Sequence, residues 1–163
     1  MAKPRPDYLD EPRTTAMLKR GSAVHVAIFK LTGGMIGRRF RMQGQLRGAP
    51  PVCLLTTIGR KSGQARTVPL LYLNDGERIV MVASQGGMPR HPLWYLNLRA
   101  NPNVLVHIGR HRRPMRARTA DGTERAELWP RLVEMYPAYD DYQSWTDREI
   151  PVVVFEPVQD SAV

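Results

Sequence analysis

Between Pro51 and Pro157 the chain consists of short apolar runs separated by turn signals, and this pattern limits the possible folds most. The turn signals are Gly, Pro and Asn-Asp-Gly, and Pro69 within the second run predicts a bulge or an edge position. Two helices are expected between the later runs, at residues 91–100 and 123–135, with Thr123 as the N-cap of the second. The expected strands are residues 52–58, 65–73, 78–84, 104–108, 114–119 and 150–156. Six short strands with late helices predict a mainly β (α+β) protein, a small antiparallel barrel rather than a βαβ fold.

The 163 residues suffice for one sizeable core. Residues 1–48 are expected to form a basic N-terminal arm, and residues 49–163 the barrel domain. No apolar stretch approaches the roughly 20 residues that span a bilayer, and the start of the chain lacks the apolar region of a secretory signal. A single cysteine, Cys53, excludes an internal disulfide and fits a reducing cytosol, so a cytoplasmic location is expected.

The net charge of +9, from 24 Lys and Arg against 15 Asp and Glu, indicates an anionic partner. Most of these cations are arginine, which is suited to bidentate phosphate or carboxylate contacts. Nucleic acid, a membrane surface and a polyanionic small molecule all satisfy this requirement. Composition does not separate them.

Residues 22–31 of the arm, SAVHVAIFKL, predict an amphipathic helix, and an arginine-rich segment follows it. One interpretation is peripheral contact with an anionic membrane, which would be the inner face of the cell membrane. The other is a helix that packs on its own domain beside a solvated loop. The expected apolar face consists of Ala23, Val24, Ala27, Ile28 and Leu31.

Several common catalytic motifs are absent from the sequence. It contains no phosphate-binding GxxxxGK[ST], no GxGxxG between a strand and a helix, and no GxSxG. The four histidines form no metal-ligand set, and no carboxylate pair stands in an apolar setting. Any reaction is therefore expected to depend on a bound cofactor.

The segment at residues 54–69, LLTTIGRKSGQARTVP, places Arg60, Lys61 and Ser62 in a glycine-containing turn between two strands. Such a turn can bind an anion, because glycine permits conformations that direct backbone N–H groups inward. A basic hairpin turn that is simply solvated is the alternative.

Three further segments could complete a site with this turn. ASQGG, ending at Gly87, would let a planar ligand approach the backbone, or it is a plain strand-to-loop transition. HPLWYLN, ending at Asn97, presents aromatic side chains that core packing also explains. Tyr136, Tyr139 and Tyr142 are three apart, so on one helix they would share a face, as a packing surface or a substrate wall.

Together LLTTIGRKSGQARTVPL, ASQGG, HPLWYLNLRANPNV and MYPAYDDYQSWTDREIPVVVFEP closely resemble the deazaflavin-dependent nitroreductase family of actinobacteria. Members of that family bind coenzyme F-420, a deazaflavin whose tail carries a phosphate, a lactyl group and an oligoglutamate. The resemblance runs from about Pro51 to Pro157 and implies a split β-barrel like that of flavin-binding and pyridoxamine-oxidising enzymes. The anionic partner would then be F-420, and nucleic acid is not needed to explain the charge.

The resemblance also implies roles for particular residues. The tail would be held by Arg60, Lys61, Ser62 and Arg66. The deazaflavin would be bordered by Thr67, Val68, Pro69, Leu70 and Leu71 on one side and by Val82, Ala83, Ser84 and Gln85 on another. The cofactor groove would be completed by Leu93, Trp94, Tyr95, Leu96 and Asn97. Tyr136, Tyr139 and Tyr142 would lie on the substrate side, with Tyr139 also against the cofactor. A tyrosine hydroxyl, Ser84 or water could supply the proton that the reaction needs.

Three positions depart from the family pattern. Leu71 replaces a tyrosine that faces the substrate in a characterised nitroreductase, Val68 replaces an asparagine and Gln85 a lysine. Nitroimidazole reduction is therefore not expected to follow from the resemblance alone. The predicted function is hydride transfer from reduced F-420 to a small electron-poor acceptor: a quinone, a nitro compound or an activated alkene. The alternatives are a non-catalytic F-420 carrier and an FMN-binding oxidoreductase, and the sequence leaves the oligomeric state open.

Overall fold

The computed structural model describes residues 49–158 without a gap, and residues 4, 6, 24, 26–29 and 31 of the preceding arm. Residues 22, 23, 25 and 30 of the predicted arm helix, and the arginine-rich segment after it, lie outside the described residues.

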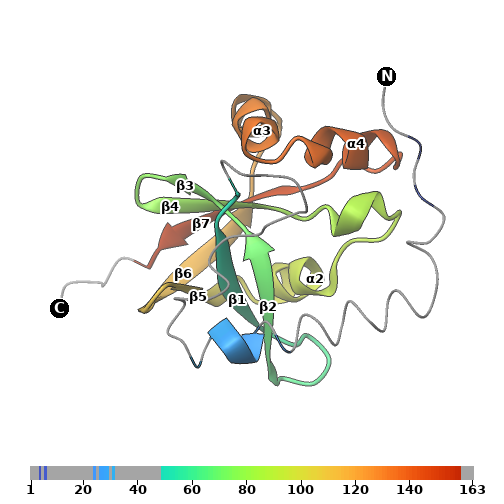
Figure 1. Cartoon of the computed structure of the whole chain (residues 1–163). Coiled ribbons are helices and arrows are strands. Elements are labelled where there is room, and N and C mark those ends of the chain that lie inside the picture. The colour runs from blue at the N-terminus through green and yellow to red at the C-terminus, as the bar shows by residue number, and fades with distance from the viewer. Residues whose placement is uncertain are drawn as a thin grey trace.

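Seven antiparallel strands form one curled sheet in the described part of the chain (Figure 1). The hydrogen-bonded order is β2-β1-β5-β6-β7-β4-β3. The strands are β1 (Val52–Ile58), β2 (Ala65–Leu71), β3 (Leu73–Asp75), β4 (Arg78–Val82), β5 (Asn103–Ile108), β6 (His111–Thr119) and β7 (Val152–Pro157).

The sheet curls into a barrel because one extended segment takes part at both ends of the strand order. Leu71 at the end of β2 pairs with Val52 of β1, whereas Leu73 at the start of β3 pairs with Val80 of β4. Between them the amide of Tyr72 donates to the carbonyl of Pro51 at 3.2 Å. The strand expected at residues 65–73 is thus two strands, and the predicted antiparallel barrel is confirmed.

Pro69 pairs with Leu54 of β1 and lies on β2, the terminal strand of the hydrogen-bonded order, where a residue without an N–H is tolerated. The predicted edge position is therefore confirmed.

Helices α3 (Gly122–Met135) and α4 (Ala138–Ser144) cover one end of the barrel, and α2 (Leu93–Ala100) packs on β1 (Figure 1). The prediction of Thr123 as the N-cap is wrong. Asp121 is the N-cap, and its Oδ1 accepts from the amide of Glu124 at 2.9 Å. The carboxylate two residues earlier satisfies the exposed amides of the first turn, so the helix starts at Gly122.

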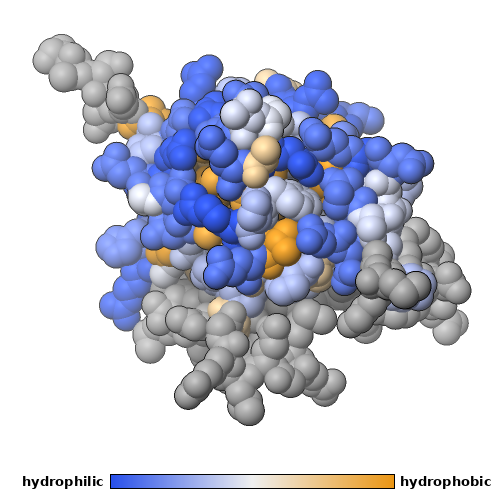
Figure 2. Space-filling view, turned by 90° about the horizontal axis from the view of Figure 1, so that it is seen from above, coloured by the Kyte–Doolittle hydropathy of each residue, from blue (hydrophilic) through white to orange (hydrophobic). Residues whose placement is uncertain are grey.

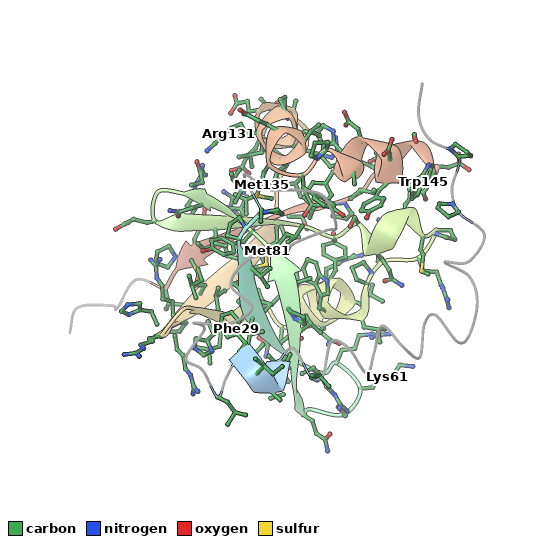
Figure 3. All side chains as sticks on the ribbon, in the orientation of Figure 1. Phe29, Lys61, Met81, Arg131, Met135 and Trp145 are labelled. Carbon is green, nitrogen blue, oxygen red and sulfur yellow. The ribbon has the colours of Figure 1, made fainter. Side chains whose placement is uncertain are left out.

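Strands β4 and β7 are buried on both faces, which explains their uninterrupted apolar runs. Ile79 and Met81 of β4 belong to the core inside the barrel, whereas Val80 and Val82 pack toward α3 and α4. Met81 lies in the middle of the molecule (Figure 3). The face that carries α3 and α4 is mostly hydrophilic, with small hydrophobic areas (Figure 2). The two helices thus shield the second apolar face of these strands.

The described residues of the predicted arm helix are helical, but a different side chain attaches them to the barrel. Phe29 is fully buried and packs edge-on against His107 of β5, with ring centroids 5.2 Å apart. Val24, Ile28 and Leu31 of the predicted apolar face are 58%, 39% and 86% exposed. The face expected from periodicity therefore points to solvent.

Candidate active site

Two pockets adjoin along β2. The basic pocket, of about 480 Å³, is lined by Thr57, Gly59, Arg60, Lys61, Ser62, Arg66, Thr67, Val68, Leu93, Trp94 and Asn97. The tyrosine pocket, of about 430 Å³, is lined by Val52, Pro69, Leu70, Leu71, Val82, Ser84, Gly86, Tyr136, Tyr139 and Tyr142. Residues 67 and 68 line the first pocket and residues 69–71 the second, so an elongated ligand along β2 would meet both. Lys61, on the β1–β2 turn, lies far from Trp145 at the end of α4 (Figure 3).

The β1–β2 turn is closed by its own backbone. The amide of Gly59 donates to the carbonyl of Gln64, and the amide of Gly63 donates to the carbonyl of Gly59, both at 2.8 Å. Gly63 has a φ of 67°, which favours glycine. A Cβ at Gly59 would lie 2.7 Å from the Ser62 Oγ. The turn therefore presents its cations from a defined backbone.

Asn97 of α2 attaches this turn to the body of the protein. Its Oδ1 accepts from the amide of Arg60 at 3.2 Å, and its Nδ2 donates to the Thr57 Oγ1 at 3.2 Å. The side chain is 6% exposed. A buried amide with both ends bonded fixes two segments relative to each other, so α2 positions the basic turn.

The cations of the basic pocket have no carboxylate partner among the described residues. Arg60, Lys61 and Arg66 are exposed, and the ion pairs of the described residues involve arginines on β4, β6 and α3 instead. Three neighbouring unpaired cations repel one another and attract anions. With the hydroxyl of Ser62, they can bind a phosphate or several carboxylates.

The three predicted tyrosines meet in the second pocket, but not on one helix as expected. Tyr136 is the C-cap of α3, and Pro137 precedes α4, which carries Tyr139 and Tyr142. Extended backbone at Tyr136, the residue before a proline, ends the first helix. The ring centroids are nevertheless 5.1–6.3 Å apart, and the hydroxyls of Tyr136 and Tyr142 lie 3.2 Å from each other. Folding thus brings the three tyrosines together from two separate helical segments.

Tyr139 is the most deeply buried of the three, at 4% exposed. Burial, and the neighbouring Tyr136 and Tyr142, raise the pKa of its phenol well above the usual range. The group therefore stays protonated and can donate a hydrogen bond. No described side chain or backbone group accepts from its hydroxyl, so a ligand in the pocket can accept this bond.

A loop after β4 forms a further wall of the tyrosine pocket, next to α4. Ser84 and Gly86 line the tyrosine pocket. Gly87 packs against α4, because a Cβ there would lie 2.7 Å from the carbonyl oxygen of Tyr142. The small residues of this segment therefore permit a close approach, as expected, but at Gly87 the approaching group is a helix of the protein itself.

Most of the predicted site residues line one of these two pockets, and four do not: Ala83, Gln85, Tyr95 and Leu96. Ala83 is fully buried, and Gln85 is exposed. Tyr95 belongs to the core, with its hydroxyl 3.0 Å from the Thr119 Oγ1. The roles assigned to the predicted site residues stay predictions, both for those that line a pocket and for these four.

Four pocket residues received no individual role from the sequence, although three of them lie in the segments noted there: Val52, Thr57, Gly59 and Gly86. Val52 and Thr57 lie on β1 directly opposite Leu71 and Arg66 of β2. Hairpin register could have identified them, since cross-strand partners on one face are neighbours.

The chain was compared with protein families and with curated relatives. A family profile for F-420H(2)-dependent quinone reductase matches residues 22–157. The chain is 43% identical over 134 residues to the F-420H(2)-dependent quinone reductase Rv1261c of Mycobacterium tuberculosis, covering 80% of this chain and 86% of that protein. It is 44% identical over 117 residues to Rv3178 of the same species, which bears the same family name, covering 72% and 98%.

The chain is also similar to several solved structures. An F-420-H2-dependent reductase (FDR-A) superposes with a TM-score of 0.61 at 48% identity, covering 65% of this chain and 94% of that chain. A structure described as a domain-swapped dimer superposes at 0.63 and 38% identity, covering 88% and 99%. The heme storage protein HutZ of Vibrio cholerae, with a TM-score of 0.51 at 12% identity and coverages of 66% and 82%, shares only the fold. On the profile and the curated relatives, this chain belongs to the F-420H(2)-dependent quinone reductase family.

Proposed function

We propose that this protein transfers a hydride from reduced coenzyme F-420 to a quinone. The observation that carries the proposal is the pair of adjoining pockets along β2. One contains three cations that form no ion pair within the described residues, and the other contains three tyrosines. Family membership supports the same cofactor and the same class of acceptor.

The chemistry of the two pockets fits the cofactor. Arg60, Lys61, Ser62 and Arg66 would hold the phosphate and carboxylates of the tail. The largely apolar residues of β2 from Thr67 to Leu71 would lie along the planar ring system, which the tyrosine pocket would receive. The turn and α2 are held together by Asn97 before any ligand binds, so little ordering of that part is required on binding.

Reduced F-420, when bound, supplies the hydride. The protein would position the acceptor and supply a proton to its oxygen. The tyrosine wall would exclude water and orient the acceptor, and orientation alone can contribute much of the acceleration. Conversion of a quinone to a hydroquinone by a hydride also needs a proton on oxygen. The Tyr139 hydroxyl would donate a hydrogen bond to the acceptor oxygen, and Ser84 or the Tyr136–Tyr142 hydroxyl pair would relay the proton from solvent.

The tyrosine pocket also bears on the carrier alternative. A carrier would cover the space beside the ring by packing the tyrosine segment and the arm helix over it. The pocket among the tyrosines instead leaves about 430 Å³. Because the ring system would occupy part of this space, an enzyme requires the remainder to stay open to an acceptor, whereas a carrier would close it.

The test is to titrate the purified protein with oxidised F-420, FMN and heme, and to follow oxidation of reduced F-420 with and without menadione. We expect binding of F-420 alone and menadione-dependent oxidation. Binding without oxidation would identify a carrier, and preferential binding of FMN or heme would refute the cofactor assignment.

We further propose that the arm contacts a membrane surface, where lipid-soluble quinones reside. The exposed apolar side chains of Val24, Ile28 and Leu31 support this. None of the described helices is long and apolar enough to cross a membrane. Pelleting with anionic vesicles should retain the full chain, whereas a variant with Val24, Ile28 and Leu31 changed to Ser should stay in the supernatant; equal pelleting would refute the contact.

A further inference from the structure

Arg148, in the segment after α4, directs its guanidinium at backbone carbonyls of the loop after β4. Its Nε donates to the carbonyl of Met88 at 2.9 Å. Its Nη2 donates to the carbonyl of Ser84 at 2.7 Å and, more weakly, to that of Ala83 at 3.3 Å. One side chain thus forms hydrogen bonds with carbonyls at both the start and the end of the loop.

The guanidinium has no carboxylate partner among the described residues, and its fourth contact is also neutral. Its Nη1 lies 3.3 Å from the Nδ1 of His91. Burial lowers the pKa of Arg148, although an arginine remains charged near neutral pH. A partly buried cation costs free energy unless its hydrogen bonds offset the loss of water. The loop carbonyls are what offset it here.

The loop needs such support because its backbone is locally unfavourable. Gln85, Gly86 and Gly87 have φ values of 47°, 62° and 72°, three consecutive residues in the left-handed region. For a residue with a side chain, such as Gln85, this conformation costs about 1–2 kcal/mol. Strained loops of this kind persist where the surrounding structure holds them.

Arg148 therefore connects three segments that border the candidate active site. The loop contributes Ser84 and Gly86 to the tyrosine pocket, and α4, just before Arg148, contributes Tyr139 and Tyr142. Gly87 packs the loop on α4, against Tyr142 and Trp145. His91 lies two residues before α2, which borders the basic pocket.

We propose that Arg148 is a positioning residue for the proposed quinone reduction: by holding the carbonyls of Ala83, Ser84 and Met88, it sets the distance between the Ser84–Gly86 wall and the α4 wall of the tyrosine pocket. Arg148 is not one of the residues that line either pocket. Because this inference rests on the proposed function, its test includes a measurement on the protein without cofactor.

The experiment compares Arg148→Ala and Arg148→Lys with wild type and with the control Arg131→Ala, which removes an arginine on α3 paired with Asp75, away from both pockets. We expect Arg148→Ala to lower kcat about tenfold or more, because misplaced walls misorient the acceptor. F-420 affinity should change less than about threefold, since the tail residues are untouched. Lysine should restore little, because a single ammonium cannot span separated carbonyls.

Hydrogen exchange supplies the measurement without cofactor. The amides of Gly87 and Met88 donate within the loop, to Ser84 and Gln85, and should exchange faster in both Arg148 variants and not in Arg131→Ala. Should Arg148→Ala not fold, Gly87→Ala displaces the loop from α4 independently and should reproduce the loss of kcat with retained affinity.

The outcomes separate the two proposals. Unchanged exchange and unchanged kcat in Arg148→Ala, or in Arg148→Lys if the alanine variant does not fold, would overturn the role of Arg148. A wild-type protein without menadione-dependent turnover would overturn the proposed function, while the exchange data would still decide whether Arg148 holds the loop.

Discussion

At the scale of single residues, the basic pocket brings three cations together with no carboxylate partner among the described residues. Arg60, Lys61 and Arg66 face solvent without a carboxylate, although the described residues contain several paired arginines. Charges arranged in this way favour binding of an anion over stability of the fold. Their loss should therefore affect ligand affinity first.

We predict that Lys61→Ala combined with Arg66→Ala weakens F-420 binding by about 100-fold or more, since each charge-assisted hydrogen bond contributes about 1.5–3 kcal/mol. The residual binding should depend less on salt. A fluorescence titration at two salt concentrations measures both effects. The control, Arg112→Ala with Arg116→Ala on β6, removes the same charge at exposed positions and should bind normally. Equal affinity of the two double variants would refute the assignment of the turn.

Tyr139 provides a second prediction at this scale. Replacement by Phe keeps the ring contacts with Tyr136 and Tyr142 and removes the buried hydroxyl. We expect kcat with menadione to fall about tenfold or more and cofactor affinity to stay within about threefold, because the hydroxyl acts on the acceptor. Steady-state kinetics and titration measure the two quantities. Weakened cofactor binding with unchanged kcat would move Tyr139 into the cofactor site.

At the scale of elements, α2 holds the β1–β2 turn through one amide side chain. Asn97 bonds both the backbone of Arg60 and the side chain of Thr57, and it is buried. The aromatic residue Trp94 on the same helix lines the same pocket. The basic pocket is therefore a property of a helix and a hairpin together.

Asn97→Ala should lower the free energy of unfolding by about 1–3 kcal/mol, because it leaves a buried hydroxyl and an amide without partners. F-420 affinity should fall as well, since the turn is no longer held. Urea unfolding and titration measure these effects. Asn101→Ala serves as the control, because the Asn101 side chain bonds only the exposed amide of Asn103. Full affinity in Asn97→Ala would show that the turn keeps its shape alone.

At the scale of the whole molecule, an ion-pair network joins the β3–β4 hairpin, β6 and α3. Glu124 pairs with Arg118 at 2.5 Å and with Arg78 at 3.1 Å, and Arg78 also pairs with Asp75. Arg131 of α3 contacts Asp75 at 2.9 Å. The hydrogen bond from Arg118 lowers the pKa of Glu124, and those from Arg131 and Arg78 lower the pKa of Asp75. The network holds α3, which packs on the side chains of Val80 and Val82 of β4, against the barrel.

A carboxylate with a lowered folded pKa stabilises the fold above its unfolded pKa, about 4.3 for Glu, and loses this contribution as the pH falls through the folded value. We therefore predict that Glu124→Gln lowers the free energy of unfolding by about 1 kcal/mol at pH 7, near the upper limit for a surface pair. The difference from wild type should shrink below about pH 4. Urea unfolding from pH 7 to pH 3 measures it, and a difference that grew with acidity would contradict the network.

The sequence by itself determined the residue types and the local order of this protein. Strand positions, the glycine turn with its cations and the late helices follow from apolar periods and turn chemistry, which act over a few neighbouring residues. Tertiary structure decided what those signals do not encode. It divided residues 65–73 between both ends of the sheet, ended a helix at Tyr136 while keeping the three tyrosines together, and exposed Val24 and Leu31 while burying Phe29. It also placed Arg148 on carbonyls 60 or more residues earlier in the chain. Such contacts depend on barrel closure and packing between distant segments, and no local pattern records them.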